Sequence, residues 1–362
     1  MKKHVRFMLC VAMLFGIIPN VFSGVHAEEI PAFAIEPQYY YAESFSEGLA
    51  AVLKEKGGFI DKTGKEVIPL QYDDVRSFSE GLARVQRNGK FGFINKNGEE
   101  IISPKYDSAE SFKDGMAVVL KNEKYGFVDK TGKEVIPLQF GWAESFSEGM
   151  ALVGKNGKAF FISKTGKEVM PLYSWTKGFS EGLLIIRKNG KFVYIDKTGK
   201  EVVKPQKPYD DVGNFSEGLA WVEKNNKRGY IDKTGKEVIP LIYDWASDFR
   251  EGMAGVSVNG MYGFIDKTGK IVVKPQYHSV ESFSEGLAGV VKDGKGGYID
   301  KTGKVVIPLI YDSAISFKEG LVLVYVNGYW GYLANPLTNN NSNVSSKGSS
   351  IDKGTGDSGI TN

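Results

Sequence analysis

Acidic side chains are the first candidates for chemistry, because one recurs in every copy of a short segment typified by S-F-S-E-G. Two carboxylates are enough for a glycosidase, so carbohydrate chemistry has to be considered. These acids are Glu47, Glu80, Asp114, Glu148, Glu181, Glu217, Glu251, Glu285 and Glu319. An active site needs asymmetry, however, and a residue present once in each of nine copies indicates a structural role in a turn. We therefore predict no catalytic residue, and the alternative is a carboxylate-dependent carbohydrate-active enzyme.

Large aromatic residues supply the asymmetry that the acids lack. Trp142, Trp175 and Trp245 stand four residues before a repeated phenylalanine, as does Tyr41, whereas other copies have Asp or Ser there. Trp221 occupies a second variable position, six residues after the phenylalanine, which we expect to face outward. These five residues are candidate ligand contacts, because aromatic rings can stack on sugars or hold an extended peptide. The alternative is that each ring fills a gap between neighbouring copies.

Several other chemistries are excluded by composition. The only cysteine is Cys10, and His278 is the only histidine beyond His26. Disulfides, thiol catalysis and His/Cys metal sites therefore have no residues to rest on once the N-terminal segment is removed. The recurring D-K-T-G segment brings one carboxylate where a calcium loop needs several oxygen ligands. We predict no cofactor and no metal.

The first 27 residues resemble a secretory signal. Lys2, Lys3 and Arg6 precede an apolar run, and a small-residue cleavage site ends near Ala27. The whole chain has 46 basic and 43 acidic residues, so removal of those three basic residues leaves a formal charge of zero. Such a chain has no global field to attract nucleic acid. We expect a secreted or cell-surface protein without an integral membrane span, whose partner is a protein or a cell-wall glycan.

The rest of the sequence repeats one unit. The glycine of the D-K-T-G segment recurs at intervals of 33 to 36 residues, at Gly64, Gly98, Gly132, Gly166, Gly199, Gly235, Gly269 and Gly303. A fixed period of this size is typical of solenoids, propellers and arrays, in which one unit cannot bury its apolar face without a neighbour. The aromatic residue of the S-F-S-E-G segment is present in all nine copies and is predicted to be a core position.

Each unit contains three recognisable strands. Residues 82–86 alternate around Val85, Asn88-Gly89 suits a type I′ hairpin turn, and residues 91–94 run back as the second strand. The D-K-T-G corner predicts a turn capped by its acid, and a third strand follows it, with a proline at its end or edge. We expect Ser77–Gly81 to form one short helical turn capped by the glycine. The corner lysines, such as Lys62, predict either a cationic ridge for an anionic polymer or protection against edge pairing.

The units resemble WG repeats, also called KWG repeats, a bacterial β-repeat family. Its pattern is N-G-K-W-G-Y-I-D followed by a glycine turn and I-P; Trp330-Gly331 keeps the literal dipeptide, and Phe91-Gly92 and Tyr125-Gly126 substitute another aromatic. Ala159-Phe160 and Phe192-Val193 depart further. The resemblance implies an interaction-type β-repeat array, with no catalytic residues to transfer.

The sequence predicts an all-β fold with three parts. Residues 1–27 are the signal peptide, residues 28–333 hold about nine three-stranded hairpin units, and residues 334–362 form a disordered Asn/Ser/Gly-rich tail. We expect an open solenoid, because propellers usually have 4 to 8 four-stranded blades. A closed propeller-like ring is the alternative, since a lone strand at the start and a hairpin at the end could complete one another.

Overall fold

The computed structural model describes residues 32–171 and 176–339, which contain 35 β-strands and one helical turn. The predicted signal peptide, Trp175 and most of the predicted tail lie outside the described residues. The last strand ends at Ala334, and the one-turn helix α1 (Pro336–Asn339) follows it. The repeat domain therefore extends past Leu333, where the sequence placed the start of the tail. Within the described residues, no helix is long and apolar enough to span a membrane.

The strands form nine separate antiparallel sheets, which we call blades 1 to 9 in chain order. Blades 1 to 4 are β2 (Tyr41–Ala42), β3 (Leu49–Leu53), β4 (Gly57–Asp61), β5 (Glu66–Tyr72); β6 (Asp74–Val75), β7 (Leu82–Arg87), β8 (Lys90–Asn95), β9 (Glu100–Tyr106); β10 (Ser108–Ala109), β11 (Met116–Lys121), β12 (Lys124–Asp129), β13 (Glu134–Phe140); β14 (Trp142–Ala143), β15 (Met150–Lys155), β16 (Lys158–Ser163), β17 (Glu168–Pro171).

The remaining blades continue this order. They are β18 (Thr176–Ser180), β19 (Leu183–Lys188), β20 (Lys191–Ile195), β21 (Glu201–Val203); β22 (Asp211–Val212), β23 (Leu219–Lys224), β24 (Lys227–Asp232), β25 (Glu237–Tyr243); β26 (Trp245–Ala246), β27 (Met253–Val258), β28 (Met261–Asp266), β29 (Ile271–Tyr277); β30 (Ser279–Val280), β31 (Leu287–Lys292), β32 (Lys295–Asp300), β33 (Val305–Tyr311); and β34 (Leu321–Val326), β35 (Tyr329–Ala334), β1 (Phe33–Tyr39).

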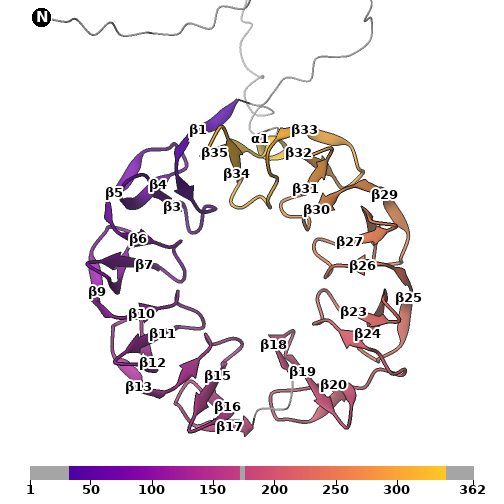
Figure 1. The fold of residues 1–362 in the computed structure, drawn as a ribbon, viewed down its shortest axis with the longest axis horizontal. Helices are drawn as coiled ribbons and strands as arrows, with labels where there is room; N and C mark the ends of the chain where they lie inside the picture. Colours follow the sequence, from indigo (N-terminus) through magenta and orange to yellow (C-terminus); the bar gives the residue numbers. More distant parts are fainter. Residues whose placement is uncertain (1–31, 172–175, 340–362) are drawn as a thin grey trace, which may run out of the picture. The chain divides into compact units, whose positions relative to one another are not determined.

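The nine blades form a closed ring, so the prediction of an open solenoid is wrong (Figure 1). The N-terminal strand β1 pairs with β35 and completes blade 9, which is the closure that the alternative reading of the sequence allowed. The aromatic ring of Tyr332 packs edge-on against Phe45 at 5.0 Å, and its hydroxyl donates to the Glu43 carbonyl at 2.8 Å. The first and last blades thus meet through the same kind of contacts as any two neighbours.

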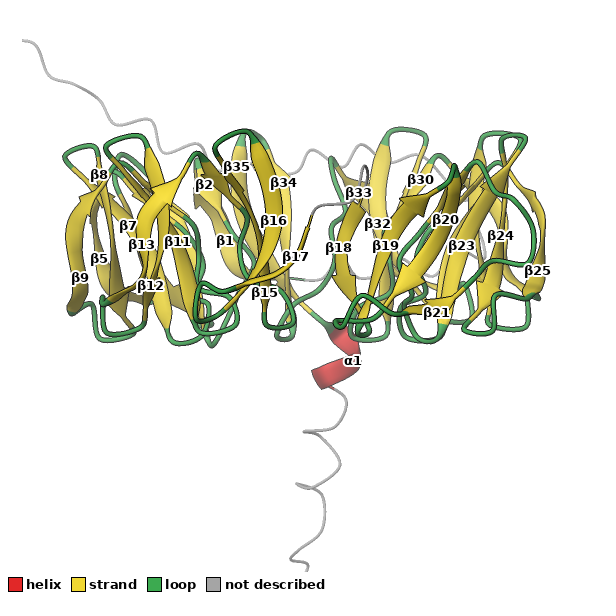
Figure 2. Cartoon of the chain, turned by 90° about the horizontal axis from the view of Figure 1, so that it is seen from below, coloured by secondary structure: helices red, strands yellow, loops and turns green. Residues whose placement is uncertain are grey.

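Eight blades have four strands, where the sequence predicted three. The additional strand has two residues in seven of these blades, and it precedes the repeated phenylalanine. Figure 1 shows these short strands nearer the middle of the ring and outer strands such as β5, β9 and β29 at the circumference. The strands run between two flat faces, and α1 lies on one of them (Figure 2). Two residues are too few to leave a period-two pattern, which is why the sequence did not show them.

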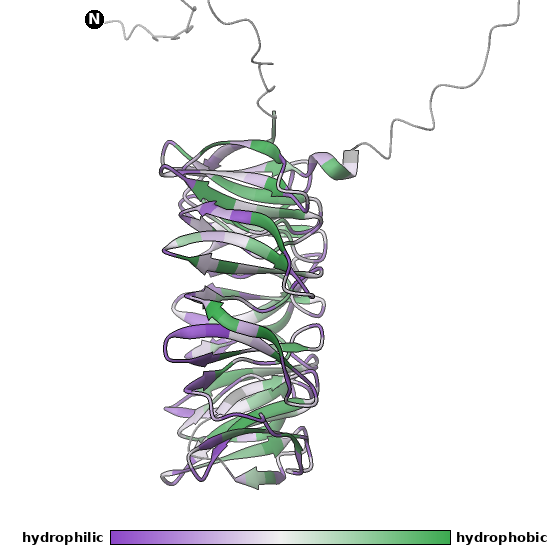
Figure 3. Cartoon of the chain, turned by 90° about the vertical axis from the view of Figure 1, so that its right-hand side faces the viewer, coloured by the Kyte–Doolittle hydropathy of each residue, from purple (hydrophilic) through white to green (hydrophobic). Residues whose placement is uncertain are grey.

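The phenylalanine of each unit packs against an aromatic residue of the preceding blade. Each one lies against the aromatic residue two positions after the WG aromatic in the preceding blade, with centroids 4.8 to 5.9 Å apart; the pairs include Phe59–Phe78, Phe127–Phe146, Tyr230–Phe249 and Tyr298–Phe317. All nine phenylalanines are buried, which confirms the predicted core position. The core is therefore a series of interfaces between blades, and hydrophobic segments lie in the strands while hydrophilic ones gather at turns (Figure 3).

The variable position six residues after the phenylalanine faces the next blade and not the solvent, so the outward prediction is wrong. Ala51 and Val118 are fully buried at this position, in the clusters between blades 1 and 2 and between blades 3 and 4. Arg84 and Trp221 occupy it too and are partly buried. Neighbouring blades cover both faces of each sheet, so a side chain at this position packs against a blade.

The S-E-G segment forms a tight reverse turn, which corrects the predicted helical turn. Ser46 and Leu49 form an antiparallel bridge, and between them Glu47 and Gly48 have φ angles of 57° and 89°. Two successive positive φ angles are the signature of a type I′ turn. The same conformation at Asn88 and Gly89, with φ of 51° and 73°, confirms the predicted Asn-Gly hairpin.

The glycine of the WG dipeptide lets the outer strand approach closely. A Cβ atom at these glycines would lie 2.3 to 2.7 Å from a backbone atom of the outer strand; the positions are Gly58, Gly92, Gly126, Gly229, Gly263, Gly297 and Gly331. All seven blades with this glycine have a seven-residue outer strand. Phe160 and Val193 replace it in blades 4 and 5. The outer strand β21 of blade 5 has only three residues, whereas β17 of blade 4 ends at Pro171, next to residues outside the described ranges. In blade 5 the departure from the repeat pattern therefore coincides with a shortened outer strand.

Candidate ligand-binding site

The repeated acids join neighbouring blades and are not arranged as a catalytic pair. Each carboxylate accepts a hydrogen bond from the main-chain N–H of the turn glycine in the next blade, at 2.6 to 3.4 Å; the donors are Gly81, Gly115, Gly149, Gly182, Gly218, Gly252, Gly286, Gly320 and Gly48. The positive φ of the acid turns its side chain toward that neighbour. The structural role that the sequence indicated is confirmed.

The first lysine of the D-K-T-G corner also binds a repeated acid and so joins the same two blades. Seven such lysines form ion pairs with the repeated acid of the preceding blade; they are Lys62–Glu319, Lys96–Glu47, Lys130–Glu80, Lys197–Glu148, Lys233–Glu181, Lys267–Glu217 and Lys301–Glu251, at 2.9 to 3.2 Å. These lysines are not a free cationic ridge, because each already faces a carboxylate. In blade 9 the buried Asn335 stands in the lysine's place and donates to the Glu285 carbonyl at 3.1 Å.

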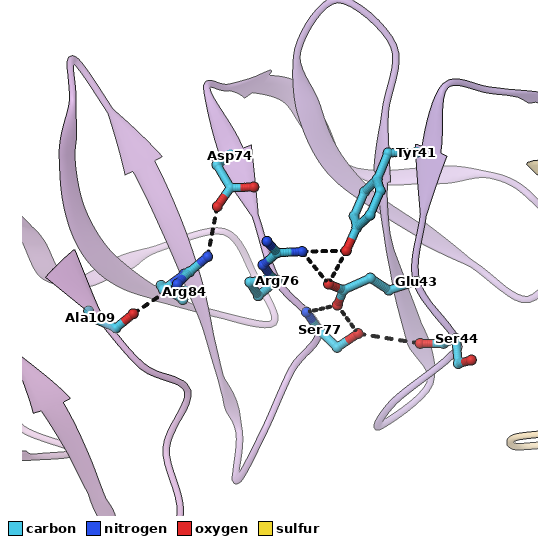
Figure 4. A network of polar contacts seen from close by, with 8 residues as sticks. All are labelled: Tyr41, Glu43, Ser44, Asp74, Arg76, Ser77, Arg84 and Ala109. Carbon is cyan, nitrogen blue, oxygen red and sulfur yellow. Dashed lines mark hydrogen bonds and ion pairs between the residues drawn. The ribbon is translucent and has the colours of Figure 1, made fainter. Parts of the chain in front are cut away.

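Tyr41 belongs to a polar network between blades 1 and 2 (Figure 4). Its hydroxyl donates to Glu43 Oε1 at 2.6 Å, and Arg76 contacts both groups. The other Glu43 oxygen accepts from the Ser77 N–H at 2.6 Å. Burial raises the pKa of Tyr41 to about 12, with the bond to Glu43 adding to it. Burial alone would raise the pKa of Glu43, but its bonds to Ser77, Tyr41 and Arg76 outweigh it and lower the pKa. Tyr41 is therefore committed to joining two blades.

Trp142 lies in the short inner strand β14 of blade 4, and Trp175, the candidate of the next unit, is outside the described residues. Trp142 is 41% exposed and crosses over Gly154, its cross-strand partner; a Cβ there would come within 2.1 Å of the indole nitrogen. A shallow hollow of about 390 Å³ beside it is lined by the hairpin of blade 4. The Trp142 indole therefore covers Gly154 and is also accessible to a ligand.

Trp221 and Trp245 are the two predicted residues that the structure brings together. Both line a hollow of about 450 Å³ on the inner strand of blade 7 and its neighbours, blades 6 and 8. The guanidinium of Arg228 lies 4.0 Å from the Trp221 ring centre, and Arg228 Nε binds Glu223 at 2.8 Å. Trp245 packs edge-on against Tyr262 at 5.5 Å. Each indole is therefore held rigidly on one side while the other borders the hollow.

A glycine makes room for the Trp221 indole. A Cβ at Gly213 would lie 2.3 Å from the indole nitrogen, whereas a Cβ at Gly255 would meet Val280 first, at 3.0 Å, and Trp245 only at 3.4 Å. Gly213 stands where blades 1, 3, 4 and 8 have glutamate, as at Glu43 and Glu281. The Trp221 indole is therefore accommodated by a glycine at a position where other blades have a larger side chain.

Charged groups border the same hollow. Arg250 replaces the serine whose hydroxyl, in blades such as blade 6 (Ser216), donates to the phenylalanine carbonyl of the next blade. Arg250 is exposed; its main chain bonds to Met253, but its side chain has no hydrogen bond or ion pair to another described residue. Glu281 is also exposed, yet the surrounding walls desolvate its carboxyl enough to raise its pKa. Two aromatic rings, a cation and an acid thus surround one space.

Comparison with known proteins identifies the repeat. The WG containing repeat family matches nine segments, residues 32–56, 58–91, 91–125, 125–158, 160–192, 194–227, 229–262, 262–295 and 297–330. The chain belongs to the WG-containing repeat family. This confirms the resemblance seen in the sequence, and the nine matched WG repeats correspond in number to the nine blades.

Solved structures resemble the WG ring in fold alone. A eukaryotic initiation factor is 14% identical, with 85% of this chain and 93% of that chain covered and a TM-score of 0.53. The dihydro-heme d1 dehydrogenase NirN in complex with DHE is 14% identical over 81% of each chain, with a TM-score of 0.42. Kluyveromyces lactis Hsv2p is 11% identical, covering 72% of this chain and 96% of that one, with a TM-score of 0.36. A search of the curated proteins gave no match.

Sequence reasoning missed the polar residues of the hollow. Arg228 takes the place of the WG aromatic, and Arg250 takes the place of the serine in S-F-S-E-G. Both therefore break the WG repeat pattern in adjacent units, and this was the signal that could have found them. Nothing in the pattern distinguishes Glu281 from the other glutamates at its position; only the hollow does.

Proposed function

We propose that this WG-repeat protein is a secreted, non-enzymatic binding and scaffold protein whose ligand is a glycan held between Trp221 and Trp245. The ring architecture supports a binding or scaffold role. The observation that carries the ligand class is the convergence of two rigid indoles, Arg250 and Glu281 on one hollow. Ligand sites typically combine aromatic walls with a few polar groups that fix orientation.

A sugar ring suits this combination. Its C–H face can lie on an indole, while its hydroxyls can accept from Arg250 and donate to Glu281 or Ser247. The indoles are braced by Arg228 and Tyr262, so little conformational entropy is lost when a ligand stacks on them. A protein ligand would use the same groups, and the experiment below distinguishes the two.

A carbohydrate-active enzyme is the second candidate, because of one observation. Glu281 and Asp248 line the same hollow, and the raised pKa of Glu281 is the property of a general acid. The regular acids are not available for this role, since each binds a glycine N–H. Release of reducing sugar from a bound glycan, abolished by Glu281→Gln, would favour the enzyme over the binding protein.

The ligand proposal is tested by sedimentation of the purified chain with isolated bacterial cell walls. We expect Trp245→Ala to reduce wall binding at least tenfold at both low and high salt, since stacking is little screened. Trp142→Ala is the matched control, because it removes an exposed indole elsewhere on the ring, and it should bind as the unsubstituted chain does. Equal binding by both variants would contradict the assignment, and absence of wall binding would point to a protein ligand.

Secretion is a separate part of the proposal. It rests on the sequence of residues 1–27, which lie outside the described residues. The N-terminal residue of the protein recovered from the medium should be Glu28. Retention of the intact N terminus inside the cell would contradict this part and leave the ligand assignment standing.

A further inference from the structure

The seam where the ring closes carries an aromatic pair in place of an ion pair. At four other junctions the first residue after the hairpin turn is a lysine that pairs with the aspartate directly after the outer strand of the same blade; these pairs are Lys56–Asp73, Lys90–Asp107, Lys227–Asp244 and Lys295–Asp312. At the seam the corresponding residues are Tyr329 and Tyr40. Their rings lie 5.6 Å apart with an angle of 32° between their planes.

Both tyrosines are accessible, although large aromatic residues are generally buried. Tyr40 is 60% exposed and Tyr329 40% exposed. They border a hollow of about 470 Å³ with Gln38, Lys54, Glu55, Lys56 and Leu70. Ion pairs occupy this place at four other junctions, so closing a junction does not require aromatic rings.

The cations around the hollow are already engaged. Lys54 Nζ donates to Gln38 Oε1 at 2.9 Å and lies 5.3 Å from the Tyr39 ring centre. Lys56 Nζ forms an ion pair with Asp73 at 2.5 Å. Glu55 is exposed and makes no hydrogen bond or ion pair to another described residue, so its carboxylate can accept hydroxyl protons. The hollow therefore offers apolar ring faces and a hydroxyl acceptor, without a free cation.

From this arrangement we infer a second ligand site at the seam, which takes the pyranose ring of a neutral glycan stacked on Tyr40 and Tyr329. A pyranose has an apolar C–H face for the rings and peripheral hydroxyls for Glu55 and the Gln38 amide. A polyanionic glycan would meet Glu55 without a compensating free cation, so the site discriminates by charge. This site is separate from the Trp221–Trp245 hollow and does not depend on the function proposed for it.

Ligand binding at this place is linked to ring closure. Tyr40 directly follows β1, whereas Tyr329 begins β35, so the two rings meet only when β1 completes blade 9. A ligand that contacts both rings binds the closed ring and not an opened one. Its binding free energy therefore adds to the stability of the closed ring.

The test uses the full chain carrying Trp245→Ala, so that sugar binding at the other hollow does not contribute; the unsubstituted chain is measured alongside. The probes are cellohexaose and chitohexaose, with hexagalacturonate as the charged comparison, in titration calorimetry and thermal unfolding. We expect a neutral probe to bind and, at about 100 times its Kd, to raise the unfolding midpoint by roughly 4 °C. Hexagalacturonate should bind at least tenfold more weakly.

The decisive variant combines Tyr40→Asp with Tyr329→Lys, because it installs the ion pair found at the four other junctions. Its unliganded unfolding midpoint should stay within about 2 °C of the parent, since exposed pairs contribute little. Its affinity for the neutral probe should fall at least tenfold, and the thermal shift should vanish. Retained binding in this variant overturns the proposal, as does failure of the parent chain to bind either neutral probe. If the variant does not fold, Tyr40→Ala and Tyr40→Phe replace it, with binding lost in the first and kept in the second.

Discussion

Glu319 Oε2 accepts a hydrogen bond at 3.0 Å from the main-chain N–H of Gly48, which lies 271 positions earlier in the sequence. The same oxygen pairs with Lys62 at 3.2 Å. This arrangement repeats the contact between every pair of neighbouring blades, so the protein closes its ring with the device that it uses throughout. Several consequences can be measured.

Substitution of Glu319 should weaken the closure selectively. Glu319→Ala removes a charged acceptor from a partly buried N–H, a loss of about 1–2 kcal/mol in the free energy of unfolding. Urea denaturation followed by tryptophan fluorescence measures it. Glu319→Asp shortens the side chain but keeps the charge, and Asp114 shows that aspartate can make this bond. Equal losses for both variants would contradict a role for the bond itself.

Stability should fall in acid because of the repeated glutamates. Burial tends to raise the pKa of Glu319, but Lys62 and the Gly48 N–H outweigh it, so its pKa lies below the usual 4.5. A depressed pKa in the folded state means that the stabilisation is complete above the unfolded value and is lost as pH falls through the folded value. Glu47, Glu181 and Glu217 have pKa values lowered in the same direction.

We therefore expect the urea midpoint to be level near neutral pH and to drop progressively below about pH 4.5. Glu319→Gln should make this drop shallower, because the substituted side chain no longer titrates. Similar midpoints at pH 3 and pH 7 would show that these carboxylates do not hold the blades together.

Strand β1 should be separable from the rest of the ring and able to return to it. Deletion of residues 32–39 leaves the edge of β35 unpaired and removes buried Ile35 and Tyr39 from the seam. An unpaired edge promotes association between chains, so the truncated protein should form oligomers in size-exclusion chromatography. A synthetic peptide of residues 32–40 should restore the monomer, whereas a scrambled peptide should not. A truncated chain that remains monomeric and equally stable would show that β1 is dispensable.

The WG glycine should not tolerate even one methyl group. In Gly126→Ala the new Cβ would lie 2.7 Å from the Ile136 carbonyl oxygen, so β13 has to move. Overpacking of this kind costs about 1–3 kcal/mol. Gly141→Ala is the matched control, at the link between blades 3 and 4, because its Cβ would meet only the Gly154 carbonyl at 3.7 Å. Thermal unfolding of the two variants should differ clearly, and equal midpoints would remove this explanation of the glycine.

The tyrosine of blade 6 should contribute through its hydroxyl. Tyr230 is fully buried and donates to the Ser247 carbonyl at 2.6 Å, beside the tryptophan hollow. Tyr230→Phe leaves that carbonyl without its partner and should cost about 1 kcal/mol. Tyr125→Phe, at a partly exposed hydroxyl without a described partner, should change the free energy of unfolding by less than about 0.5 kcal/mol. The opposite ranking in urea denaturation would contradict this role.

Local features of the unit were predictable because each depends on a few neighbouring residues. The Asn-Gly hairpins follow from positive φ at both positions, and the buried phenylalanine follows from its invariance among copies in one chain. The Glu47–Gly48 turn was mistaken for a helical one, because glutamate rarely adopts a positive φ. Only the bond from its carboxylate to Gly81 in the next blade shows why it does so here.

The candidate site was predictable only in part. Trp221 and Trp245 stand out as aromatic residues at variable positions, but they differ by 24 positions and belong to different units. Their meeting at one hollow, and the presence of Arg250 and Glu281 there, depend on contacts among three blades. Tyr40 and Tyr329 are farther still from one another in sequence, and no local pattern relates them.

By itself, the sequence determined the repeat, its length, its Asn-Gly hairpins and the buried phenylalanine of each unit, because these follow from short-range conformational preferences and from periodicity. Only the tertiary structure decided that the units form a ring. The rotation from one blade to the next is set by packing such as Phe59 against Phe78, and nine small rotations have to add up before β1 can reach β35. Solenoid and ring use the same local contacts, so the choice between them exists only at the level of the whole chain.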